Sequence, residues 1–138
     1  MRTFLGALFV LGSTGALAEL LLLEHFEENW QRLPIALLVA AIVVVVASML
    51  RPGSTAVRAT TTVMVGFVAS GLIGLYQHYQ VNLEFELEMN ASRHGWELML
   101  ETLMGATPAL APATMIYLGL LGLGYAHLAR RDLSLLGD

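Results

Sequence analysis

The chain has 138 residues, of which 57% are hydrophobic and only 13% are charged, and its mean hydropathy is +0.69. A soluble domain carries about a quarter charged residues, so most of this surface is expected to face lipid. The absence of cysteine excludes disulfides, thiolate metal sites and quinone-linked disulfide oxidation, and the net charge of −4 argues against nucleic acid as a partner.

Residues 3–23 contain one charged side chain, Glu19, and predict a first membrane-spanning helix. About 20 helical residues, at about 1.5 Å each, cross a hydrocarbon core of about 30 Å. A signal peptide is the alternative, because Arg2 precedes an apolar run and residues 16–18 (ALA) have the form of a cleavage site. The apolar run resumes at Leu20 and fills a full span, which favours an uncleaved helix.

A second span is predicted over residues 34–50, after a short polar connection. Pro34 suits the start of a helix, where a missing N–H costs nothing. The turn formers in residues 51–54 (RPGS) end the span. Trp30 in the first connection and Trp96 later in the chain are the candidate interface anchors, since tryptophan favours the headgroup level.

A third span is predicted over residues 59–79 and a fourth over 108–129. Pro108, preceded by threonine, marks a helix start, and Pro112 implies either a kink in the fourth span or a separate entry turn over 107–111. Both spans carry small residues that let another helix approach closely. These residues are Gly66, Ser70 and Gly74 in the third span and Gly119, Gly122 and Gly124 in the fourth.

Residues 80–107 form the one long polar interval and predict an outer segment. Val81–Asn90 alternates strictly between apolar and polar residues, and this period of two predicts an extended segment outside the hydrocarbon core. The period then changes, and an amphipathic helix is predicted over Trp96–Met104 at the interface, with Glu97 and Glu101 on its polar face. Because that face is acidic, protein contact is expected to hold this helix rather than anionic lipid.

The distribution of arginine predicts the orientation in the membrane. Five arginines fall on the side of the termini and two on the other side, so the positive-inside rule places both termini in the cytoplasm. The five are Arg2, Arg51, Arg58, Arg130 and Arg131, and the two are Arg32 and Arg93.

Three stretches carry a resemblance to a known group of proteins. They are Gln77–Met89 (QHYQVNLEFELEM), Gly95–Leu98 (GWEL) and Gly105–Pro112 (GATPALAP), with Glu24-His25 and Trp30-Gln31 of the first connection. Together they resemble small, uncharacterised four-span proteins of bacterial genomes, and the resemblance covers most of the chain. It implies a bacterial inner membrane and a four-helix layout, and no site residue carries over from it.

Three histidines, His25, His78 and His94, are predicted on the outer side among nine glutamates, counting Glu19. Imidazole with carboxylate can bind zinc or a related divalent ion, although no pair has a ligand spacing such as H-x-x-x-H. A solvated acidic rim is the favoured interpretation. Two histidines could instead bind haem between helices, and His25 and His78 are expected at comparable depth, but His127 falls on the opposite side, which disfavours a two-haem relay.

Other candidate chemistries receive less support. Glu84, Glu86 and Glu88 would share one face of an extended segment at about 6.6 to 7 Å between successive members, too far apart for one compact Ca²⁺ cage. Three methionines, Met89, Met99 and Met104, fit apolar packing better than copper binding. A catalytic triad is not supported because serines are few and Ser13, Ser48 and Ser70 lie within spans. We therefore expect no cofactor and no enzymatic activity.

The position of Glu19 inside a span suggests a polar partner, because a charge at the bilayer centre costs about 2.5–3.5 kcal/mol. Glu19 shares the small-residue face of its helix, and the stripe on the third span ends at His78. We predict that Glu19 pairs with His78, or with nearby Tyr76 or Gln77. Alternatively, Glu19 marks the upper end of the first span, and first and third helices are diagonal in a simple up-down bundle.

The sequence thus predicts an all-α membrane protein, a four-transmembrane-helix bundle with an outer extended segment and an interfacial amphipathic helix. The function expected from it is that of an integral membrane accessory or assembly subunit whose acidic outer segment docks a partner. The alternative is a small oligomeric transporter or ion- or proton-conducting protein that uses Glu19. The expected partners are the bilayer and a membrane protein or further copies of the chain.

Overall fold

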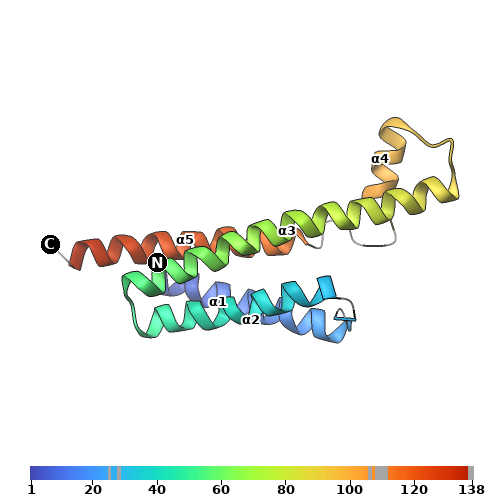
Figure 1. Cartoon of the computed structure of the whole chain (residues 1–138). Coiled ribbons are helices and arrows are strands. Elements are labelled where there is room, and N and C mark those ends of the chain that lie inside the picture. Colours follow the sequence, from blue (N-terminus) through green and yellow to red (C-terminus); the bar gives the residue numbers. More distant parts are fainter. Residues whose placement is uncertain (25, 28, 106, 108–111, 137–138) are drawn as a thin grey trace.

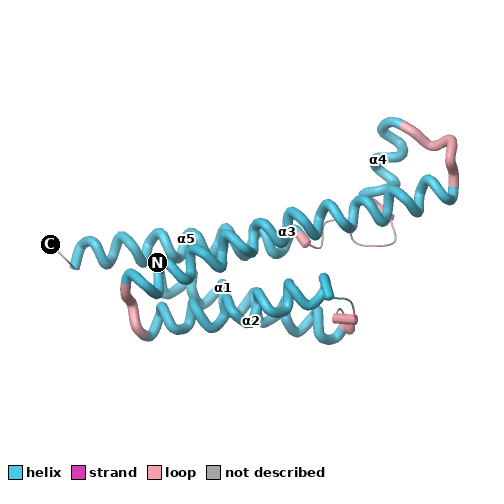
Figure 2. Tube along the Cα trace, viewed as in Figure 1, coloured by secondary structure: helices cyan, strands magenta, loops and turns pink. Residues whose placement is uncertain are grey.

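A computed structural model describes residues 1–24, 26–27, 29–105, 107 and 112–136. Every regular element in these residues is a helix, which confirms the all-α class (Figure 2). The helices are α1 (Arg2–Leu22), α2 (Asn29–Leu50), α3 (Ser54–Met89), α4 (Gly95–Leu103) and α5 (Ala113–Leu136). By length and composition, α1, α2 and α3 could each cross a membrane, which indicates a membrane protein.

The four long helices alternate in direction around a common core. Helix α2 packs between α1 and α3, and α5 packs between α3 and α1, so α1 and α3 are diagonal neighbours. The N-terminus, the C-terminal end of the chain and the α2–α3 turn lie at one end of the molecule (Figure 1). The connection from α1 to α2 and helix α4 lie at the other end.

The core is apolar and contains buried aromatic side chains. Phe9 of α1 and Phe67 of α3 are fully buried, and their ring centroids are 6.0 Å apart across the diagonal. Tyr125 of α5 is also buried, and its hydroxyl lies 3.1 Å from Oγ of Ser48 in α2, so its polar atom has a partner in the apolar interior.

Helices α3 and α5 approach each other closely through glycines. A Cβ added to Gly71 would lie 2.9 Å from the backbone nitrogen of Ile116, and one added to Gly119 would lie 3.0 Å from the backbone oxygen of Met64. The predicted role of small residues is therefore confirmed for this pair of helices. The predicted stripe differs in detail, because Gly66 faces α2, where an added Cβ would lie at an ordinary contact distance of 3.6 Å from Cδ2 of Leu37.

The prediction of an extended segment over Val81–Asn90 is wrong. Helix α3 continues without interruption to Met89. Extending an existing helix adds one backbone hydrogen bond per residue and needs no new nucleus. The polar positions Asn82 and Glu86 are four residues apart, so they share one helical face, and both are buried. The helix predicted over Trp96–Met104 is present as α4, while its place at a membrane interface stays a prediction.

Helix boundaries differ from the predicted spans at several points. Helix α2 begins at Asn29, with Pro34 inside it. A proline so near the helix start removes one hydrogen bond in the second turn, and the helix accommodates it. Helix α5 begins directly after Pro112, whose carbonyl accepts a hydrogen bond from the Met115 N–H at 3.0 Å. It continues beyond Arg130, where the fourth span was predicted to end, as far as Leu136. Residues 108–111 lie outside the described residues.

Candidate functional site

The most distinctive feature of the structure is a helical hairpin at the end opposite the termini. It consists of the last turns of α3 from Tyr79 to Met89, the turn 90–94 and helix α4, and is called the outer hairpin below. In Figure 1 this part of α3 extends beyond the end of α2, and α4 folds back beside it. Two of the candidate residues from the sequence, His94 and Trp96, lie on it, and His78 directly precedes it.

Asn82 ties α3 to α4 and to the segment that follows α4. Its side-chain amide donates to the backbone oxygens of Thr102, at 2.9 Å, and Thr107, at 2.7 Å. Its Oδ1 accepts hydrogen bonds from the Thr107 backbone N–H at 3.1 Å and the Thr107 hydroxyl at 2.6 Å. The residue is 1% exposed. A buried amide with all its bonding positions filled holds two chain segments in one register.

Gly105 lies against this amide and makes the tight approach possible. A Cβ added to Gly105 would lie 2.7 Å from Cγ of Asn82, closer than real Cβ contacts allow. The Thr102 hydroxyl turns back to the Leu98 carbonyl of its own helix at 2.7 Å, so it does not compete for Asn82. The Asn82 cluster (Asn82, Thr102, Gly105 and Thr107) therefore depends on a residue without a side chain at position 105.

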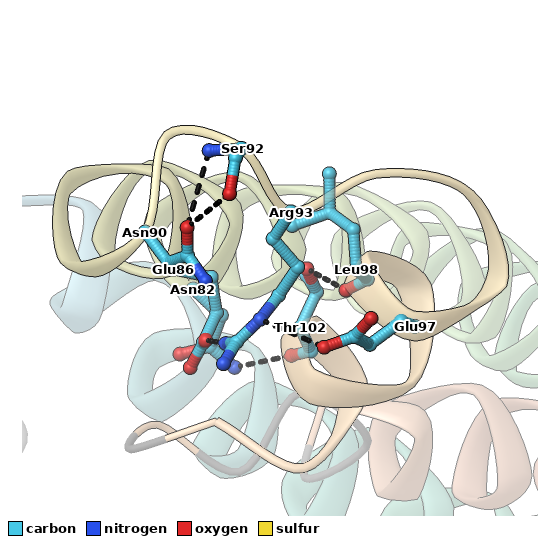
Figure 3. A network of polar contacts seen from close by, with 8 residues as sticks. All are labelled: Asn82, Glu86, Asn90, Ser92, Arg93, Glu97, Leu98 and Thr102. Atoms are coloured by element: carbon cyan, nitrogen blue, oxygen red, sulfur yellow. Dashed lines mark hydrogen bonds and ion pairs between the residues drawn. The ribbon is translucent and has the colours of Figure 1, made fainter.

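An ion pair closes the hairpin one turn further out. The Arg93 guanidinium binds the Glu86 carboxylate, and its Nε lies 3.6 Å from Oε1 of Glu97 (Figure 3). The side chains of Glu86 and Arg93 are 11% and 21% exposed, whereas that of Glu97 is 71% exposed. The inner pair is thus shielded from water, and Glu97 adds a weak outer contact.

The turn between α3 and α4 is built from residues suited to tight turns. Oδ1 of Asn90 accepts hydrogen bonds from the Ser92 backbone N–H at 3.2 Å and the Ser92 hydroxyl at 2.7 Å (Figure 3). Gly95 has φ +64°, a left-handed conformation that glycine adopts without strain. This local geometry brings Arg93 back over Glu86.

The outer surface of the hairpin carries apolar side chains among acidic ones. Three exposed apolar residues of α3 lie four positions apart and three of α4 follow at spacings of four and three, so each helix presents an apolar stripe, and Leu87 is exposed beside the stripe of α3. They are Val81, Phe85 and Met89 on α3 and Trp96, Leu100 and Leu103 on α4. The exposed glutamates Glu84, Glu88, Glu97 and Glu101 lie among them. We call this surface the hairpin face.

The histidines are not gathered into a metal site by the described structure. His78 is half-buried on α3, and His94 is exposed, with its Nδ1 2.9 Å from the Ser92 carbonyl oxygen. Within the described ranges no three His, Asp or Glu side chains are grouped closely enough to hold a metal ion. His25, the third candidate ligand, lies outside the described residues.

Glu19 and His78 are not brought together among the contacts of the described residues. Glu19 is exposed near the end of α1, and α1 and α3 are diagonal neighbours. The pairing of Glu19 with His78, Tyr76 or Gln77 stays a prediction. The two tryptophans are both exposed, Trp30 by 65% in the first turn of α2 and Trp96 by 67% in the first turn of α4.

The residues that organise the hairpin were not identified from the sequence as a site. The turn formers between Asn90 and Gly95 are a local signal for two helices joined by a turn. No local signal links Asn82 to Thr107, which is 25 residues away. Comparison of the chain with protein-family models, with curated proteins and with solved structures gave no match.

Proposed function

We propose that the chain is a four-span accessory or assembly subunit of a bacterial inner membrane, and that the outer hairpin docks a partner protein. Three helices are long and apolar enough to span. The fourth span would be α5, which has 24 residues and packs along both α3 and α1. The bacterial inner membrane rests on the resemblance given above.

The proposed orientation places both termini in the cytoplasm. Arg2, Arg51, Arg58, Arg130 and Arg131 belong to the end of the bundle that carries the termini and the α2–α3 turn (Figure 1). Arg32 and Arg93 belong to the other end. An excess of arginine in short connections favours retention on the cytoplasmic side. The outer hairpin then lies outside the cytoplasm.

The observation that carries the proposal is the length of α3 together with what its outer part presents. Helix α3 has 36 residues, which corresponds to about 54 Å at 1.5 Å per residue, while a hydrocarbon core is about 30 Å thick. The last turns therefore project beyond the lipid. In this part of the chain the hairpin face exposes six large apolar side chains. The two helices that carry them are held together by buried polar contacts.

The chemistry of the hairpin face defines the kind of partner. Contiguous exposed apolar side chains commonly mark interaction sites. Residues 80–107 contain five glutamates and one arginine, and Glu86 is already paired with that arginine. The remaining four carboxylates complement a partner whose apolar contact surface is bordered by lysine or arginine. A rigid scaffold also limits the entropy lost on binding.

A matched pair of tryptophan variants tests the proposal. The tagged protein is purified from native membranes, and associated subunits are quantified by mass spectrometry. Trp96→Ala is expected to reduce a stoichiometric foreign subunit by about 30-fold or more, as for a central aromatic anchor. Trp30→Ala is the control, because Trp30 is equally exposed at the same end but lies outside the hairpin. Equal retention of the subunit in both variants would refute docking through the hairpin face.

An oligomeric transporter or ion-conducting protein is the second candidate. It is favoured by the exposure of Glu19 on the outer surface of a single bundle, where a second copy could cover it. In this case the same purification yields copies of the chain alone, at a fixed stoichiometry, and Glu19→Gln reduces ion flux in reconstituted vesicles. Self-association that Glu19→Gln leaves unchanged, together with unchanged flux, would remove this candidate.

A further inference from the structure

A second candidate site lies at the opposite end of the bundle, between the start of α3 and the end of α5. A groove of about 500 Å³ is lined there by Ser54, Val57 and Arg58 from α3 and by Arg130, Leu133 and Ser134 from α5. Both helices thus contribute one arginine, one serine and one apolar side chain. Such a lining is amphiphilic, with cations and hydroxyls beside an apolar surface.

Both arginines of the groove lack an acidic partner in the described part of the chain. Arg2, at the same end, pairs with Asp132 at 3.1 Å, and Arg93 pairs with Glu86. Neither Arg58 nor Arg130 takes part in an ion pair there. Asp132 is two residues from Arg130, so it points to the other side of α5, where it meets α1. Two like charges therefore share one groove, and their repulsion is relieved when an anion binds between them.

We propose that this groove binds the phosphate of an anionic phospholipid. Guanidinium groups bind phosphate oxygens through two parallel hydrogen bonds, and serine hydroxyls can donate to the same oxygens. Basic pockets between membrane helices on the cytoplasmic side are suited to anionic headgroups. Leu133 of α5, which is half-buried, gives the lining an accessible apolar surface, as the glycerol and upper acyl chain of a lipid require.

The inference uses the membrane placement proposed above and is independent of any partner at the outer hairpin. Free phosphate shares the chemistry of the headgroup, but it has no apolar part to cover Leu133. Phospholipid is therefore expected to bind more tightly than inorganic phosphate. The extra affinity that the apolar surface gives to a lipid therefore distinguishes phospholipid from free phosphate as the ligand.

The test is native mass spectrometry and thermal unfolding of the full chain in detergent, with phosphatidylglycerol, phosphatidylcholine or inorganic phosphate added. Phosphatidylglycerol is expected to remain bound and to raise the melting temperature of the wild type more than either other probe. In the double variant R58Q/R130Q, affinity for phosphatidylglycerol is expected to fall by about tenfold or more, because charge-assisted hydrogen bonds are lost. The control is R51Q, because Arg51 is exposed at the same end and does not line the groove.

Two results would overturn the assignment. If R51Q and R58Q/R130Q lose affinity for phosphatidylglycerol to the same extent, lipid binding depends on the overall positive surface charge and the groove is not a specific site. If inorganic phosphate alone produces the full thermal shift and phosphatidylglycerol adds nothing, the ligand is free phosphate. Arg58 and Arg130 are both exposed, so the double variant is expected to fold, and unfolding without added ligand checks this directly.

Discussion

Replacing Asn82 by alanine should open the outer hairpin without unfolding the bundle. The substitution removes four hydrogen bonds, which join Asn82 to Thr102 and Thr107. Because the site is buried, the partner groups lose their hydrogen bonds as well, and each unsatisfied group costs about 1–3 kcal/mol. Water entering the space left by the amide offsets part of this cost. We expect a net loss of about 2–4 kcal/mol, confined to the hairpin, because the apolar core between α1, α2, α3 and α5 is untouched.

Amide hydrogen exchange of the full chain in detergent or nanodiscs measures this loss locally. A change of about 2–4 kcal/mol corresponds to a roughly 30- to 700-fold loss of protection for the amides of α4, since about 1.4 kcal/mol is tenfold. The loss cannot exceed the protection that the wild-type hairpin has. Amides in the buried part of α3, around Phe67, should keep their protection.

Asn90→Ala is the matched control, because it removes the same side chain from an exposed position of the same hairpin. Asn90 accepts two hydrogen bonds from Ser92 in contact with solvent, so water can replace them. We expect less than about fivefold loss of protection in α4. If Asn82→Ala and Asn90→Ala reduce protection equally, the Asn82 cluster does not hold the hairpin and the reasoning is wrong.

Three further predictions address the ion pair, the helix packing and the topology. Glu86→Ala should destabilise the hairpin by about 1.5–3 kcal/mol in hydrogen exchange, because Arg93 loses its shielded charge-assisted partner and keeps only the weak contact with Glu97, whereas Glu97→Ala should cost at most about 1 kcal/mol. Equal effects would contradict this ranking. Gly71→Ala should lower the melting temperature through overpacking of about 1–3 kcal/mol, while Gly15→Ala, with open space around it, should not. If both variants lower the melting temperature, the effect comes from the loss of glycine's backbone flexibility and not from the close approach of α3 and α5 at Gly71. Reporter fusions in the α2–α3 and α3–α4 turns should read cytoplasmic and external respectively, and the reverse pattern would refute the orientation.

The positions of the three most apolar helices could be predicted from the sequence because the requirement for spanning is local. About 20 consecutive apolar residues meet it whatever else the chain does. The segments 3–23, 34–50 and 59–79 accordingly lie within α1, α2 and α3 apart from a residue at one end. The helical period after Gly95 is also a local property, and it predicted α4 within one residue at each end.

The conformation of residues 81–89 was decided by tertiary contacts. A period of two is the ordinary signal of a strand, but it also places Asn82 and Glu86 four residues apart on one side of a helix. Which description applies depends on whether these two polar side chains find partners there. Their partners, Thr107 and Arg93, come from separate segments, and no rule based on neighbouring residues brings them into contact.

Local hydrophobicity and period therefore determined where the three most apolar helices lie, the extent of α1 and α4, and which end carries the arginines. The tertiary structure alone decided that α3 continues to Met89, that α4 folds back onto it, and that Arg58 and Arg130 share a groove. The physical reason is that burial in lipid depends on a segment's own composition. The satisfaction of a polar or charged side chain depends instead on groups that only the folded chain brings within hydrogen-bond distance.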